Sequence, residues 1–77
     1  MKKQYTYSEM HLILIRNGYV IVGQSGSHIK YVKVGVVQHI IIKRDMCSVI
    51  FWRLIKENDL DINVLDNRYW KKIKKDK

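Results

Sequence analysis

The sequence predicts an α+β domain in which a helix, three antiparallel strands and a second helix follow one another. Three features predict it. A helix-capping pattern opens the chain, three runs of β-branched and aromatic residues separated by short turns occupy its middle, and apolar residues at helical spacing return after residue 45. Helices that flank a short sheet usually cover one face and leave the other in water. We therefore expect both helices on one face of a three-stranded sheet.

The first helix is expected to begin after Thr6 and to end at Asn17-Gly18. Thr6 and Glu9 form a T-x-x-E pattern, in which each side chain accepts a hydrogen bond from the backbone amide of the other residue. Glycine ends the helix because it adopts the left-handed cap conformation without a side-chain clash. One side of this helix should face the core and carries Met10, Ile13, Leu14 and Asn17.

Apolar residues also occupy the outward sides of both predicted helices, where a surface helix is normally polar. Leu12 and Ile15 lie opposite the core-facing side of the first helix, and Val49 and Trp52 lie outside on the second. Scattered apolar surface residues are one explanation, because they are common in soluble proteins. We favour a face buried by a partner, with Leu12, Ile15 and Trp52 as its candidate residues.

Three strands are expected at residues 19–22, 28–34 and 36–43, where β-branched and aromatic residues concentrate. The second run alternates polar and apolar residues, as a half-buried strand does. Residues 24–27 form the first predicted turn, and Gly35 forms the second. Both connections are too short for the crossover that parallel strands require, so the strands should form an antiparallel meander.

The second helix is expected to start near residue 48, with Asp45 or Ser48 as its cap, and to end at about Leu60. Its charged residues fall outside, and its core-facing side consists of Ile50, Phe51, Leu54 and Asn58, with Ile55 beside them.

The chain is expected to form a single domain, residues 1–77, with a core at about 6–60 and a basic C-terminal extension at 61–77. The extension allows two interpretations. Asp66-Asn67 could form a hairpin turn between two strands. A helix, which we favour, would instead line up Ile62, Leu65, Tyr69 and Ile73.

Charge provides the first functional indication. Fifteen Lys and Arg residues against seven Asp and Glu residues give a net charge of +8. A basic small domain suggests a polyanionic partner, nucleic acid above all, although plain solubility is the alternative. Residues 68–77 contain six basic residues and one acid, and subtracting this +5 from +8 leaves +3 for the rest. Much of the basicity therefore belongs to the extension.

Several classes of protein are disfavoured by composition. Cys47 is the only cysteine, which excludes an intramolecular disulfide and suits a reducing, cytoplasmic location. No signal peptide is expected, because Met1-Lys2-Lys3 is followed by polar residues. The longest apolar runs, residues 12–15 and 40–42, fall far short of the ~20 residues of a membrane helix. We expect no association with membranes.

Metal and cofactor sites are also not expected. His11, His28, His39 and Cys47 are separated by 17, 11 and 8 residues, which match no zinc-site spacing. The glycines of residues 23–27 are too few and too close for a phosphate-binding loop that leads into a helix. The sequence therefore predicts no cofactor.

The tripeptide Gly26-Ser27-His28 is the strongest candidate for chemistry. The amides of a tight glycine turn can approach an anion closely. Histidine exchanges protons near neutral pH, and Lys30 should share the strand face of His28 and neutralise phosphate charge. An ordinary polar turn with a surface histidine is the alternative from these residues alone.

The chain resembles the HicA family, small mRNA interferases of bacterial toxin–antitoxin systems, over about residues 9–60. The segments that carry the resemblance are Asn17-Gly18-Tyr19, Gly26-Ser27-His28-Ile29-Lys30-Tyr31, His39-Ile40-Ile41-Ile42 and Leu54-Ile55-Lys56-Glu57-Asn58. The resemblance implies an αβββα fold like that of double-stranded-RNA-binding domains and endoribonuclease activity on mRNA. It also implies a catalytic histidine at His28 and a HicB-type antitoxin as partner.

A mechanism without metal follows from this interpretation. RNA supplies its own nucleophile, so His28 would serve as general acid or base. Lys30 and the amides of Gly26 and Ser27 would hold the phosphate. Lys43 and His39 are further RNA-binding candidates, and His39 is also a candidate for the second proton transfer.

Two alternatives stay open. The chain could be a non-catalytic RNA-binding module, in which Tyr69 and Trp70 stack on bases unless they pack against the core, which we favour. It could instead be a small protein that docks a partner through its apolar outer faces. A core of this size supplies only about 3–5 kcal/mol, so a second copy of the chain is also a candidate partner.

Overall fold

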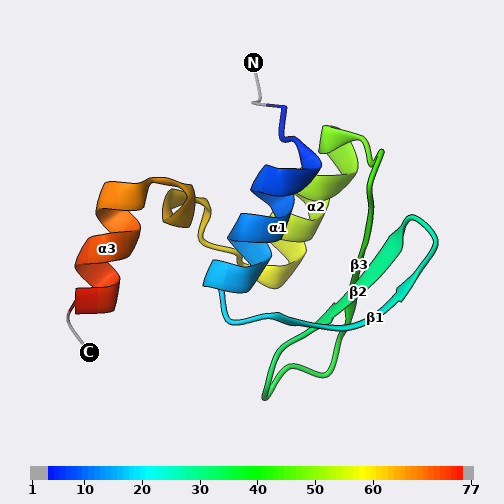
Figure 1. Ribbon diagram of the computed structural model, residues 1–77, viewed down its shortest axis with the longest axis horizontal. Coiled ribbons are helices and arrows are strands. Elements are labelled where there is room, and N and C mark those ends of the chain that lie inside the picture. The colour runs from blue at the N-terminus through cyan, green and yellow to red at the C-terminus, as the bar shows by residue number, and fades with distance from the viewer. Residues whose placement is uncertain (1–3, 76–77) are drawn as a thin grey trace.

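The elements follow the predicted order of helix, three strands and helix, with a helical extension (Figure 1). The computed structural model describes residues 4–75, and side chains for residues 4–72. The elements are α1 (Tyr7–Arg16), β1 (Val20–Ser25), β2 (His28–Val32), β3 (Ile40–Lys43), α2 (Ser48–Asn58), the short 3-10 helix η1 (Ile62–Leu65) and α3 (Asn67–Lys75). The α+β class is confirmed. None of the helices in this part of the chain is both long and apolar enough to cross a bilayer.

Helix α1 begins and ends where its local sequence predicts. The Thr6 hydroxyl accepts from the amide of Glu9 at 3.2 Å, and the Thr6 amide donates to the Glu9 carboxylate at 3.0 Å. At the other end, Gly18 has φ +96°, a backbone conformation that residues other than glycine rarely adopt. The helix buries Met10, Ile13 and Leu14.

The three strands form an antiparallel sheet in the order β1-β2-β3. Helices α1 and α2 lie on the same side of this sheet (Figure 1). The inward side chains of β2 and β3 are fully buried: Ile29, Tyr31, Ile40 and Ile42. The alternate residues of these two strands lie outside the core, so the expectation of one covered and one wet face is confirmed for β2 and β3. Strand β1 does not follow this pattern, because it has no buried residue on either face.

The predicted third strand is wrong at its beginning. Strand β3 starts at Ile40, and the preceding loop exposes Val34 by 97% and Val37 by 92%. Their β-branched side chains suggested a strand, but they meet neither a core nor a neighbouring strand. Strand β2 accordingly ends at Val32, while β1 runs on to Ser25, so the first turn consists only of residues 26 and 27.

The cap predicted for α2 is also wrong. The N-cap residue is Cys47, and no side chain caps this helix end. Ser48 is the first helical residue, and its hydroxyl instead accepts from the amide of Tyr5 at 2.8 Å. The helix ends at Asn58, two residues before the predicted Leu60, because Asp59 turns into the left-handed conformation at φ 51°.

The core-facing side of α2 differs from the prediction at one flank. Phe51 is fully buried, as expected, but Ile50 is 50% exposed, while Trp52 is half-buried. Positions 50 and 52 lie about 100° to either side of Phe51. Tyr5 decides between them, because its ring packs against those of Phe51 and Trp52 with centroids 5.5 Å apart in both cases. Trp52 is therefore not an outward residue.

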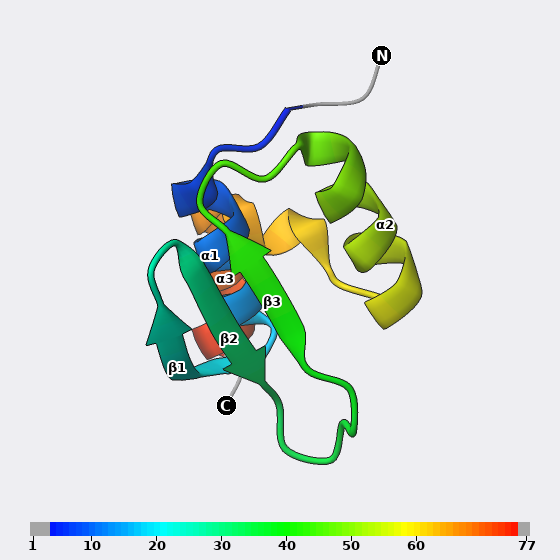
Figure 2. The same ribbon diagram turned by 90° about the vertical axis from the view of Figure 1, so that its right-hand side faces the viewer.

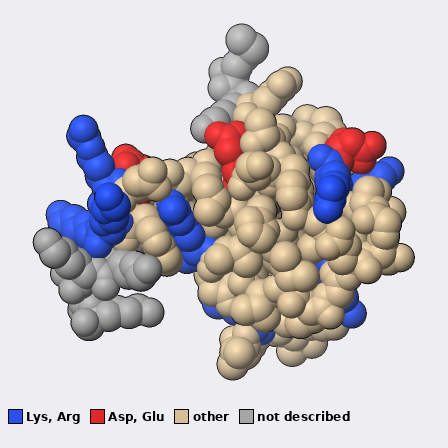
Figure 3. Space-filling view, viewed as in Figure 1, with Lys and Arg blue, Asp and Glu red and all other residues tan. Residues whose placement is uncertain are grey.

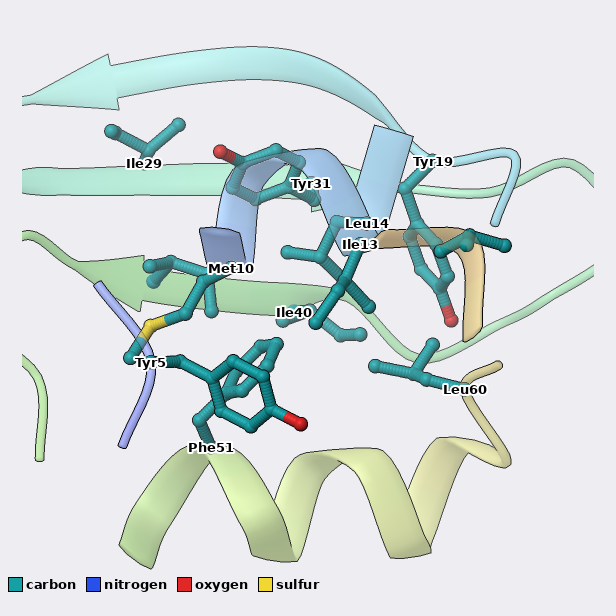
Figure 4. Close-up of a cluster of buried hydrophobic side chains, with 12 residues drawn as sticks. Tyr5, Met10, Ile13, Leu14, Tyr19, Ile29, Tyr31, Ile40, Phe51 and Leu60 are labelled. Carbon is teal, nitrogen blue, oxygen red and sulfur yellow. The ribbon is translucent and has the colours of Figure 1, made fainter. Parts of the chain in front are cut away.

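The core is formed mainly by side chains of α1, β2, β3 and α2 (Figure 4). Tyr5 enters it from the segment before α1, and Leu60 and Val64 enter it from the segment after α2. No polar or charged residue among those described is buried. Its twelve members are Tyr5, Met10, Ile13, Leu14, Tyr19, Ile29, Tyr31, Ile40, Ile42, Phe51, Leu60 and Val64.

The extension is helical, as predicted, but it divides into η1 and α3 at Asp66, whose carboxylate accepts from the amide of Arg68 at 2.9 Å. A hairpin at Asp66-Asn67 is excluded. Arg16 of α1 holds the extension through a 2.7 Å hydrogen bond to the carbonyl of Val64. The side chain of Ile73, the last member of the predicted stripe, lies outside the described residues.

Candidate nucleic-acid interface

Strand β2 lies between β1 and β3 (Figure 2), and the strand register places His28 of β2 at the centre of a row of residues across the three strands. His28 pairs with Ser25 on β1 and with Lys43 on β3. Directly paired residues of antiparallel strands place their side chains on the same face. The register therefore brings the imidazole next to one hydroxyl and one ammonium group, all three in solvent.

A second row lies beside the first. Lys30 pairs with Gly23 on β1 and with Ile41 on β3. A Cβ atom at Gly23 would meet nothing within 4 Å, so this glycine leaves space on the face. The result is a hollow of about 280 Å³ lined by Gly23, Gln24, Ser25, His28, Lys30 and Ile41. His28 and Lys30 line it together with Ile41, which is 52% exposed, and the lining as a whole is mostly apolar.

The His28 ring is accessible and unconstrained. It makes no hydrogen bond or ion pair within residues 4–75, and its neighbours in the row are exposed as well. Lys43 is drawn partly toward Asp45, whose carboxylate lies 4.0 Å from its ammonium group. An exposed pair of this kind contributes little energy, so Lys43 stays available to an anion.

Gly26 and Ser27 form the exposed tip of the hairpin next to His28. Gly26 has φ +59°, the positive value that a two-residue hairpin turn needs at its first position. The carbonyl of Ser27 accepts from the amide of Arg44 at 3.1 Å, which ties the tip to the end of β3. The turn that carries the candidate anion-binding amides is thus held in place from the opposite strand.

His39 does not lie beside His28, contrary to the sequence-based expectation. Because Lys43 is the residue opposite His28, His39 lies four residues further along, about 13 Å away at ~3.3 Å per residue. His39 is exposed in the loop before β3. This separation places His39 outside the row that contains His28, Ser25 and Lys43.

The residues predicted for a partner interface divide into two groups. Leu12 and Ile15 are each 38% exposed on α1, as expected of an outward face. Trp52 packs against Tyr5 and the core instead. In the extension, Trp70 packs against the core, as favoured, whereas Tyr69 is 36% exposed and donates to the Asp61 carboxylate at 2.8 Å.

A polar cluster beneath the sheet was not anticipated from the sequence. The buried hydroxyl of Tyr31 lies 2.8 Å from Nδ1 of His11 and 3.2 Å from the hydroxyl of Tyr7. The guanidinium of Arg44 lies 5.8 Å from the centre of the Tyr7 ring. Tyr7 and His11 are four residues apart on α1, a spacing that indicates neighbouring side chains. The sequence does not show that the Tyr31 hydroxyl, on the inward face of the sheet, lies close to both side chains.

This cluster predicts a loss of stability in alkali. Burial, with the hydrogen bond to Tyr7, raises the pKa of the Tyr31 phenol above its ordinary value near 10. Its neutral form therefore contributes stability in full below pH ~10, and that contribution is lost as pH rises toward the folded-state pKa. We expect the urea midpoint to fall above pH ~10, and to fall less in Tyr31→Phe.

The matched control is Tyr69→Phe. The hydrogen bond to Asp61 also raises the pKa of Tyr69, but this side chain is exposed. The Tyr69→Phe variant should retain the alkaline decline of the parent chain. Parallel stability curves for the parent and Tyr31→Phe between pH 8 and 12 would contradict the assignment.

Metal-binding residues do not gather within residues 4–75: no group of three or more His, Cys, Asp or Glu side chains is placed to hold an ion. Cys47 is exposed at the start of α2.

Comparison with known protein families, curated proteins and solved structures finds no match to this chain. The resemblance to the HicA family consequently stays a prediction.

Proposed function

We propose that this chain is a metal-independent endoribonuclease that cleaves mRNA, a toxin of the HicA type. The observation that carries the proposal is the hollow on the outward face of the sheet, where His28 and Lys30 line the same space. Lys43 lies beside His28 in the cross-strand row. A titratable group flanked by cations on an open surface suits a phosphodiester that is bound and then cleaved.

The proposed reaction needs only groups that RNA and this face possess. The 2′-oxygen attacks phosphorus, a new O2′–P bond forms, and the P–O5′ bond breaks. His28 removes the proton of the 2′-hydroxyl or delivers one to the departing O5′, which contributes about 10²–10⁴-fold. Lys30, Lys43 and the turn amides stabilise the extra charge on the phosphate, at about 10²–10³-fold for a well-placed donor.

The other histidines leave His28 to act alone on this face. His39 lies in the loop before β3, and His11 lies beneath the sheet with Nδ1 2.8 Å from the Tyr31 hydroxyl. The other proton transfer would therefore involve water, and we expect a slow enzyme. A HicB-type antitoxin is the proposed protein partner, with Leu12 and Ile15 as candidate contacts.

Incubation with labelled RNA in excess EDTA tests the proposed chemistry. We expect cleavage to persist in the chelator and to yield 2′,3′-cyclic phosphate and 5′-hydroxyl ends. An RNA with methylated 2′-hydroxyls should bind without being cut, because its nucleophile is blocked. Activity that disappears with EDTA and returns with zinc or magnesium would overturn the metal-independent mechanism.

A non-catalytic RNA-binding module is the second candidate. It is favoured by the absence, among the described residues, of any hydrogen bond that orients the His28 ring. Catalytic histidines usually have such a partner. The same assay separates the two candidates, because a binding module would retain RNA at moderate salt without producing cleaved ends.

A further inference from the structure

The exposed side of α3 carries a ridge of positive charge. Arg68, Lys71 and Lys72 are all exposed, and their i, i+3, i+4 spacing places them on one side of the helix. Helix α3 contains no acidic residue. Lys and Arg side chains gather at this end of the molecule in Figure 3. We refer to these three residues as the α3 ridge.

The opposite side of α3 is occupied within the protein. Trp70 packs against the hydrophobic core, and the guanidinium of Arg16 lies 5.3 Å from the centre of its ring. The same guanidinium donates to the Asn67 side chain at 3.2 Å. A basic amphipathic helix that binds a membrane needs its apolar side free to enter the lipid. Because Trp70 packs within the protein, its ring is not free to enter a lipid surface.

The two nearby acids, Asp61 and Asp66, form hydrogen bonds within the extension. Asp61 accepts from the hydroxyl of Tyr69 and the amide of Asn63, and Asp66 accepts from the amide of Arg68. Both carboxylates are thus engaged in holding η1 and the start of α3 together. No ion pair joins them to the ridge lysines within the described residues.

We propose that the α3 ridge is a second RNA-binding surface, which contacts the phosphate backbone at a distance from the His28 hollow. This inference rests on the proposed function only in taking RNA as the ligand. In Figure 1 the sheet and α3 lie on opposite sides of α1 and α2, along an axis of 36 Å. One RNA strand can therefore reach both surfaces only if it is long enough to pass around the helices.

The length requirement makes the proposal testable apart from catalysis. We would measure binding of the non-cleavable 2′-O-methyl RNA, as a strand of about 6 or about 30 nucleotides, over a range of salt concentrations. The variant Lys71→Ala/Lys72→Ala removes two charges from the ridge, and Arg53→Ala/Lys56→Ala removes two exposed charges from α2 as the matched control. Alanine favours helix, so both variants should fold, which far-UV circular dichroism checks.

For the long strand, the ridge variant should lower the slope of log K against log salt by about 1.4, which is about 0.7 for each lost phosphate contact. The loss should be smaller for the short strand, which can occupy only one of the two surfaces at a time, and the α2 control should follow the parent for both. An unchanged slope for the long strand, or an equal loss in both variants, would overturn the proposal. The proposal would also be overturned if the ridge variant lost binding to phosphatidylserine vesicles but bound RNA as the parent chain does.

The outcome is distinguishable from failure of the nuclease proposal. If the parent chain binds RNA through α3 without cutting it, the proposal for the ridge is supported and the proposal of nuclease activity is wrong. If the parent cuts RNA, and the ridge variant binds and cuts the long strand as the parent does, the proposal of nuclease activity is supported and the proposal for the ridge is wrong.

Discussion

His28→Ala is expected to reduce RNA cleavage by about 10²–10⁴-fold, the range that one placed general acid or base contributes. RNA binding should be retained, because Lys30, Lys43 and the turn amides stay in place. The side chain of His28 is exposed, so folding should also be unaffected. The measurement is the initial rate of cleavage of labelled RNA in EDTA.

The control is His39→Ala, which removes the same chemical group from the loop before β3. It should cleave RNA at the parent rate, since the register places His39 about 13 Å from the His28 row. A His28→Ala variant as active as the parent would remove His28 from the mechanism. Equal losses in both variants would point to a general effect of histidine on RNA binding instead.

Phe51→Ala is expected to have the largest effect on folding. Phe51 is fully buried, and its ring meets that of Tyr5 edge-on at 5.5 Å. Truncating a buried phenylalanine costs about 3–5 kcal/mol. A core in a chain of this size supplies about the same amount, so the variant should be largely unfolded at 25 °C. Urea denaturation followed by far-UV circular dichroism measures the loss.

Ile50→Ala is the matched control on the preceding residue. Ile50 is 50% exposed, so its loss should change the free energy of unfolding by no more than about 0.5 kcal/mol. Phe51→Leu removes less of the buried ring and should give a measurable midpoint where Phe51→Ala does not fold. Comparable losses in Ile50→Ala and Phe51→Ala would mean that Ile50 faces the core, as the sequence predicts.

The features predicted correctly depend on residues close together in the chain. Thr6 and Glu9 cap α1 across three residues, and Gly26 forms a turn because few other residues adopt positive φ there. Alternation along β2 is likewise local, and it is sufficient to predict that His28 and Lys30 share one face of the strand. The helical character of the extension follows in the same way from periodicity.

The errors arise where distant residues decide. Val36 and Val37 have the composition of a strand, but β3 pairs with β2 only from Ile40 onward. Whether Ile50 or Trp52 turns inward depends on Tyr5, which lies more than forty residues earlier. Periodicity does not show which of the two residues turns toward the core, because both lie at the same angle from the core-facing residue Phe51.

The sequence alone determined the class of the fold, the ends of α1, the hairpin tip and the shared face of His28 and Lys30, since each follows from backbone preferences and side-chain spacing within a few residues. Tertiary structure alone decided the neighbours of His28. Strand register brought Ser25 and Lys43 beside it, opened the hollow at Gly23 and left His39 in the loop before β3. Docking of α3 through Trp70 turned its basic side outward. These are long-range pairings, and they are set by which apolar faces bury one another rather than by any local pattern.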